Sequence, residues 1–183
     1  MGCTQCPRRC GADRSAGAVG YCGVSREIRV AKVMLHPWEE PCLIAGKGAG
    51  AIFFAGCPLR CVYCQNYEVS HNAKGRELTV RELGDRMLDL QRQGAHNINL
   101  VTGSHYAYQI AKALDMAKLT IPVAWNSSGY DSVDTLKMLE GKVQIYMPDF
   151  KYSDPVLAKT YSAAENYPQI AAAAIAEMYR QTG

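Results

Sequence analysis

The stretch FFAGCPLRCVYCQN, residues 53–66, contains three cysteines, Cys57, Cys61 and Cys64, and no fourth cysteine lies close by. A cubane iron–sulfur cluster has four iron corners and is held by cysteine thiolates. Three thiolates on one loop therefore leave one iron free to bind something else, just as a catalytic zinc site keeps one open position. The spacing predicts such a [4Fe–4S] site, and a structural metal loop is the alternative.

Short apolar segments alternate with segments of helical period on both sides of this loop. The sequence from Leu78 to Gly94 places Glu82 three residues after Thr79, which is the capping box that begins a helix. Strands are expected over residues 27–35, 50–55, 97–101, 121–125 and 143–147. Helices are expected over 78–94, 105–118, 131–140 and 153–180, the last broken near Pro168.

This alternation gives four successive βα units, which predict an α/β fold with a parallel sheet and right-handed crossovers. Ligands in such folds bind at the carboxyl ends of the strands. The segments that follow the strands are the cysteine loop, TGSHY (102–106), NSSGY (126–130) and PDFKY (148–152). Each is polar or contains glycine, so the binding site is expected where these four segments meet.

Composition favours a protein of the reducing cytoplasm. The chain has 183 residues, 48% of them apolar, and a formal net charge of +3. Lysine and arginine are scattered, so no nucleic-acid partner is expected. The longest apolar run, IAAAAIA (170–176), is too short to cross a membrane, so no membrane partner is expected either. Eight cysteines without an export signal indicate metal binding or catalysis rather than disulfides.

The first residues form a second cysteine group. The segment 1–26 has almost no apolar side chains to fold it, and we expect a bound metal to stabilise it in place of a core. The main domain is expected over 27–183. Zinc and a second iron–sulfur cluster are both candidates, and four reduced surface thiols are the alternative. The cysteines of the segment 1–26 are Cys3, Cys6, Cys10 and Cys22. The isolated Cys42 is expected to be a small buried apolar side chain.

With Tyr63 before its last cysteine, the Cys-x3-Cys-x2-Cys loop resembles that of the radical S-adenosylmethionine (SAM) superfamily. The resemblance implies a partial (β/α) barrel in which the free iron binds SAM. The reduced cluster then cleaves SAM to methionine and a 5′-deoxyadenosyl radical, which abstracts hydrogen. Barrels of this kind have about six βα units, so we expect a chain truncated after four, with an open fourth strand.

GAIFFAGCPLRCVYCQN and the later GAHNINLV, NSSGY and MPDFKY segments resemble the pyruvate formate-lyase activating enzyme-like group. This resemblance implies an oxidoreductase that takes an electron from a flavodoxin or ferredoxin, and a glycyl radical enzyme as a further partner. Activating enzymes carry Gly-Gly-Glu after the second strand, where this chain has Thr102, Gly103 and Ser104. These three residues are expected to hold the SAM amino group instead.

The same resemblance assigns further residues. Gln65 and Asn66 are expected to hold the adenosyl portion, with the Tyr63 backbone facing adenine. Lys151 is expected near the SAM carboxylate. A monovalent cation is expected beside it, on oxygen-rich loops. The cation positions are Asn126, Ser127, Met147 and Asp149.

Other readings stay open at the level of sequence. An iron–sulfur electron carrier or a zinc-stabilised binding module would use the same cysteines without SAM chemistry. His105 is either an acid–base group or a packing residue. The tyrosines of the strand-end segments are expected to pack or line the rim, and they are Tyr106, Tyr108, Tyr130 and Tyr152.

Overall fold

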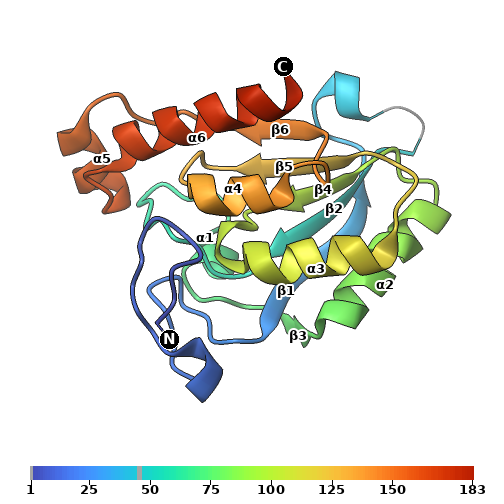
Figure 1. Cartoon of the computed structure of the whole chain (residues 1–183), viewed down its shortest axis with the longest axis horizontal. Helices are drawn as coiled ribbons and strands as arrows, with labels where there is room; N and C mark the ends of the chain where they lie inside the picture. Colours follow the sequence, from blue (N-terminus) through green and yellow to red (C-terminus); the bar gives the residue numbers. More distant parts are fainter. Residues whose placement is uncertain (1, 45–46) are drawn as a thin grey trace.

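A six-stranded sheet forms the centre of the computed structural model, which describes residues 2–44 and 47–183 (Figure 1). Its strands lie in the order β3-β1-β2-β4-β5-β6. They are β1 (Ile28–His36), β2 (Ala49–Phe54), β3 (Arg76–Leu78), β4 (Ile98–Val101), β5 (Val123–Ser127) and β6 (Ile145–Pro148). The predicted α/β class and all five predicted strands are confirmed, and β3 is an addition.

Four strands form the predicted parallel part of the sheet. β2 pairs with β4, β4 with β5 and β5 with β6, each in parallel, and Ile98 of β4 is in register with Gly50 and Val123. β1 instead pairs antiparallel with both β2 and β3. β6 is the fourth strand of the parallel series, and it lies at one edge of the sheet, as expected of an open fourth strand.

The helices are α1 (Tyr67–Ser70), α2 (Val80–Arg92), α3 (Ala107–Ala117), α4 (Val133–Leu139), α5 (Pro155–Ser162) and α6 (Tyr167–Thr182). Packing joins α2 to α3, α3 to α4 and α4 to α6. Figure 1 shows α3 and α4 in front of the sheet, α2 beside α3 at the lower right, and α6 along β6. No helix among the described residues is long and apolar enough to cross a membrane.

Helix α2 begins at the predicted capping box. The Glu82 carboxylate accepts from Thr79 N at 2.8 Å, and Thr79 Oγ1 accepts from Glu82 N at 3.2 Å. Leu83, Met87 and Leu90 are fully buried on one face, as their helical spacing predicts. Burial of each such side chain contributes about 1.5–3 kcal/mol, so α2 is held mainly by this face.

The expected helix over 153–180 is two helices. Asp154 caps α5, accepting from Val156 N at 2.6 Å, and Ala163 ends it with a left-handed φ of 52°. Pro168 lies in the first turn of α6, where its missing N–H leaves no helical bond unmade. The break brings the end of α5 into backbone hydrogen bonds with the cysteine loop. There it joins a small buried cluster of Leu59, Cys61, Tyr130, Tyr152, Ala158, Ala164, Tyr167 and Ala171.

The prediction that Cys42 is buried is wrong. Cys42 lies in a short 3-10 turn, Pro41–Leu43, and its side chain is exposed. The turn buries its neighbour Leu43 instead, which is 8% exposed. One turn of this kind can direct only part of its side chains to the core, and the larger apolar residue occupies that position.

Candidate functional site

The cysteine loop leaves β2 through a close contact with the N-terminal segment. Gly56 has a φ of +81°, and a Cβ at this position would lie 2.5 Å from the Cys22 carbonyl oxygen. The next residue, Cys57, donates its backbone N–H to the same oxygen at 3.2 Å. Only glycine fits at this position, because there is no space for a Cβ. Its backbone conformation sets the direction in which the loop starts.

All three cysteines of the loop line one cavity of about 440 Å³. Their side chains are free thiols. Each sulfur has one hydrogen-bonding partner: Leu59 N donates to Cys57 at 3.4 Å, Ser162 Oγ donates to Cys61 at 2.9 Å, and Ser70 Oγ lies 3.1 Å from the Cys64 sulfur. Hydrogen bonds of this kind are typical of the surroundings of cluster thiolates.

Burial raises the pKa of the Cys57 thiol to about 12 against the opposing effect of the Leu59 N–H, and the neighbouring Cys61 and Cys64 sulfurs add to the rise. Three thiolates so close together are costly without a cation to offset their charge. The donor set, the shared cavity and this electrostatic demand therefore fit an iron–sulfur cluster. Within residues 2–44 and 47–183, no three His, Cys, Asp or Glu side chains are grouped to hold a single metal ion.

The remaining walls of the cavity come from the ends of β4, β5 and β6, as the strand order predicts. The predicted residues that line it are Cys57, Cys61, Tyr63, Cys64, Gln65, Asn66, Thr102, Asn126, Ser127, Asp149 and Lys151. Thr102 has a φ of 61°, a left-handed conformation that costs a β-branched residue roughly 1–3 kcal/mol. The backbone of this wall is thus held in a strained conformation.

Gly103, Ser104 and Met147 are outside the set of residues that line the cavity. A Cβ on Gly103 would lie 2.8 Å from Ile110 Cδ1, so this residue packs behind the wall. Ser104 is 3% exposed and donates to the carboxylate of Asp131 at 2.6 Å. Met147 is half-buried on β6.

Asp131 connects two of the strand-end segments, and sequence reasoning missed it. Its buried carboxylate accepts from Ser104 Oγ, from Trp125 Nε1 at 3.3 Å and from Ser127 Oγ at 2.5 Å. Burial raises its pKa, and the three donors act in the opposite direction. The aspartate thereby holds the segments after β4 and β5 against each other, and Ser127 is the cavity residue that it positions.

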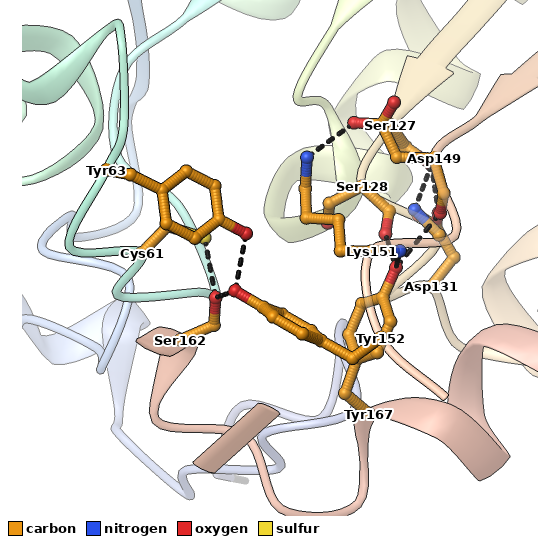
Figure 2. Close-up of polar contacts among 11 residues, drawn as sticks. Cys61, Tyr63, Ser127, Ser128, Asp131, Asp149, Lys151, Tyr152, Ser162 and Tyr167 are labelled. Carbon is orange, nitrogen blue, oxygen red and sulfur yellow. Dashed lines mark hydrogen bonds and ion pairs between the residues drawn. The ribbon is translucent and has the colours of Figure 1, made fainter. Parts of the chain in front are cut away.

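Asp149 and Lys151 form an ion pair at the cavity, with 2.6 Å between Lys151 Nζ and Asp149 Oδ2 (Figure 2). Tyr167 fixes the backbone around them, because its hydroxyl accepts from Lys151 N at 2.8 Å and lies 2.7 Å from the Ser128 carbonyl oxygen. Of the four residues expected at a monovalent cation, Asn126, Ser127 and Asp149 line this cavity.

The four N-terminal cysteines gather beside the loop. A Cβ on Gly20 would lie 3.4 Å from the Cys22 sulfur and 3.5 Å from the Cys10 sulfur. Arg14 Nη1 lies 3.9 Å from the Cys3 sulfur. Burial raises the pKa of Cys6 to about 12, and the other three thiols add to the rise.

Arginine side chains fasten this segment to the cysteine loop. Arg8 Nε donates to the Pro58 carbonyl and Arg60 Nη2 donates to the Tyr21 carbonyl, each at 2.6 Å. The Arg8 guanidinium also lies 4.2 Å from the centre of the Tyr21 ring. The N-terminal segment is therefore one wall of the loop's surroundings.

His105 lies in the interior rather than at the cavity. It is 1% exposed, its Nε2 lies 2.9 Å from the Ala55 carbonyl oxygen, and burial lowers its pKa to about 4. These contacts agree with the packing alternative. Tyr106, Tyr130 and Tyr152 are buried as well, while Tyr108 is 38% exposed.

Comparisons with known proteins identify the family. The family model of the radical SAM superfamily matches residues 51–177. An uncharacterised protein of Methanocaldococcus jannaschii is 29% identical over 174 residues, which are 90% of this chain and 50% of that protein. A pyruvate formate-lyase-activating enzyme of Clostridium pasteurianum is 30% identical over 127 residues, which are 66% of this chain and 53% of that enzyme.

The chain thus spans about half the length of each of these relatives. The region matched by the family model includes the whole cysteine loop and the strand-end segments that complete the cavity. The family model matches more than half of the chain, so this protein belongs to the radical SAM superfamily.

Proposed function

We propose that this protein holds a [4Fe–4S] cluster on Cys57, Cys61 and Cys64 and cleaves SAM reductively. The family implies both groups. The observation that carries the proposal is the set of three free thiols, each with a hydrogen-bonding partner, on a cavity that strand-end polar residues complete. When bound, the cluster supplies the electron that splits SAM into methionine and a 5′-deoxyadenosyl radical, and the protein's part is positioning and exclusion.

Different residues of the chain would bind different parts of SAM. Gln65 and Asn66 follow the third cysteine along the cavity and would hold the adenosyl portion, with Tyr63 at the rim. Across the cavity, the Lys151 ammonium would meet the SAM carboxylate while Asp149 keeps it oriented. Thr102 lines the wall that would receive the amino group, with Gly103 and Ser104 supporting it from behind.

A monovalent cation would bind near the same carboxylate. Asn126, Ser127 and Asp149 offer the hard oxygen ligands such an ion prefers, with Met147 next to them on β6. Its role would be to neutralise the negative charge that Asp149 and the substrate carboxylate bring together.

Activation of a glycyl radical enzyme is the more specific form of the proposal. It rests on the likeness to the activating enzyme of Clostridium pasteurianum. A flavodoxin or ferredoxin would then deliver the electron. A glycyl radical signal in a partner enzyme incubated with this protein, reductant and SAM would support this form, and its absence while 5′-deoxyadenosine still accumulates would reject it.

The N-terminal cysteines would hold a second metal. The four thiols of this segment lie near enough to influence one another, and they would have to draw closer together to hold either a zinc ion or a second iron–sulfur cluster. The hydrogen bonds to Pro58 and Cys57 indicate what the metal would do, which is to stiffen the wall behind the catalytic loop.

Measurement of 5′-deoxyadenosine tests the proposed function. The protein is reconstituted anaerobically with iron and sulfide, then given a strong reductant and SAM. We expect product from the wild type and none from Cys61→Ala, because two remaining ligands hold a cubane poorly. Cys42→Ala is the matched control, since this cysteine is exposed and lies away from the cavity.

Product from Cys61→Ala at the wild-type rate would overturn the proposal. An electron carrier would instead give a brown protein that makes no 5′-deoxyadenosine, and a zinc-stabilised binding module would give a colourless one. The absorbance spectrum before the addition of SAM separates these two alternatives.

A further inference from the structure

A chain of hydroxyl groups runs from the rim of the cavity to one of the cluster cysteines (Figure 2). Ser162 Oγ lies 2.9 Å from the Cys61 sulfur and 2.8 Å from the Tyr152 hydroxyl. The Tyr152 hydroxyl in turn hydrogen-bonds the hydroxyl of Tyr63. These three residues come from α5, from the segment after β6 and from the cysteine loop, so only the fold brings them together.

The direction of this chain is fixed once Cys61 binds iron. A bound thiolate has no proton and can only accept a hydrogen bond. The Ser162 hydroxyl has a single proton, so its one donated hydrogen bond must then go to the sulfur. Tyr152 must donate to Ser162, and by the same count Tyr63 must donate to Tyr152.

In the part of the chain that the structure describes, the other two cysteines have no comparable partner. Cys57 accepts from a backbone N–H, which a side-chain substitution leaves in place. The Ser70 hydroxyl near Cys64 also lies 2.9 Å from His71 Nδ1 and 3.5 Å from the Tyr67 carbonyl oxygen, and both can compete for its one proton. At Ser162 the only other side-chain partner within residues 2–44 and 47–183 is a phenol that can itself donate.

The last hydroxyl of the chain is held rigidly. Ser162 is 0% exposed at the end of α5, and its carbonyl accepts from Arg60 N at 3.2 Å. The preceding carbonyl, of Tyr161, accepts from Val62 N at 2.9 Å. α5 is therefore joined to the cysteine loop on both sides of Cys61, and these backbone bonds keep Ser162 beside the sulfur.

The phenol in the middle is fixed as well. Tyr152 is 9% exposed, and its ring packs edge-on against Tyr167 at 5.5 Å between centroids. At the far end, the hydroxyl of Tyr63 hydrogen-bonds that of Tyr152, and Tyr63 itself lines the cavity.

We propose that the hydroxyl chain Tyr63–Tyr152–Ser162 is a hydrogen-bond relay that raises the reduction potential of the cluster held by Cys61. The inference rests on the cluster of the proposed function. The reduced cluster carries one more negative charge, so a donor to its thiolate stabilises the reduced form more than the oxidised form. Each preceding hydroxyl polarises the next, which strengthens the final bond.

A redox titration followed by electron paramagnetic resonance tests the relay. The protein is reconstituted with iron and sulfide and poised at a series of potentials without SAM. At the wild-type midpoint, we expect the ratio of reduced to oxidised cluster in Ser162→Ala to fall about tenfold, which is a shift of about 59 mV for one electron. Tyr152→Phe keeps the Ser162 donor but removes its polarising partner, so a smaller shift in the same direction is expected.

Thr160→Ala is the matched control. Thr160 lies in the same helix, but its hydroxyl is exposed and donates to the Val156 carbonyl at 2.8 Å. This variant is expected to keep the wild-type potential. A Ser162→Ala potential equal to that of Thr160→Ala would overturn the relay.

If Ser162→Ala does not retain the cluster, Tyr152→Phe decides: a lowered potential supports the relay, and an unchanged one overturns it. Loss of the cluster from both variants, with retention in Thr160→Ala, would also overturn it, because the hydroxyls would then serve folding. A wild type without any cluster would overturn the proposed function and the relay together, whereas an unchanged potential overturns the relay alone.

Discussion

At the scale of single residues, the sequence predicts the groups that a spacing or a strand end marks. Cys57, Cys61 and Cys64 carry their own pattern, and the strand-end position of Asp149 places it at the cavity without any structure. Ser162 and Asp131 carry no such mark. Each acts through a contact across the fold, and a short polar side chain has no periodicity that would reveal its partner.

Gly56 is a residue whose role depends on both its backbone shape and its surroundings. Gly56→Ala is expected to lower the free energy of unfolding by about 1–3 kcal/mol more than Gly141→Ala, as measured by urea unfolding. Both glycines have positive φ, +81° and +75°, but nothing lies within 4 Å of a Cβ at Gly141. The difference between the variants measures the close contacts that a Cβ at position 56 would make with the Cys22 carbonyl, Val24 and His105. Equal losses would mean that the loop moves away from the N-terminal segment at little cost.

At the scale of elements, long periodic segments are predictable and short ones are not. α2 has a capping box and a buried face of regular spacing, and both agree with the sequence. β3 has only three residues, two of them exposed, so it forms because β1 offers it an edge. α1 has four residues and depends on the loop before it. These elements are products of tertiary contacts, which local sequence does not encode.

The N-terminal segment is an element that a metal would hold, and its cysteines should act through folding rather than catalysis. Cys10→Ala is expected to lack the zinc or iron of one metal site and to have a melting temperature several degrees lower. The protein that stays folded is expected still to make some 5′-deoxyadenosine. Cys42→Ala is the control, since both cysteines are exposed and the substitutions remove equal bulk. Elemental analysis and thermal unfolding provide the two readings. Equal metal content and melting temperature in the two variants would leave the N-terminal metal without support.

At the scale of the whole molecule, the cysteine loop joins parts of the chain that are far apart in sequence. Cys57 N bonds the N-terminal segment, while Arg60 N and Val62 N bond the end of α5. Apart from these bonds, α2 packs on β1, β2 and β4, and α3 packs on α2. Sequence predicts the order of the elements, but not that one loop would connect the first 25 residues to residues beyond 160.

Because of these bonds, cluster binding should order three separate segments at once. Reconstitution with iron and sulfide is expected to slow amide hydrogen exchange in the N-terminal segment, in the cysteine loop and at the end of α5, and to leave α2 and α3 unchanged. The backbone bonds from Cys57 to Cys22 and from Val62 to Tyr161 would transmit the constraint. Cys61→Ala, treated in the same way, should show no slowing. Protection limited to the loop itself would show that these bonds do not couple the segments, and that the N-terminal segment is a separate unit after all.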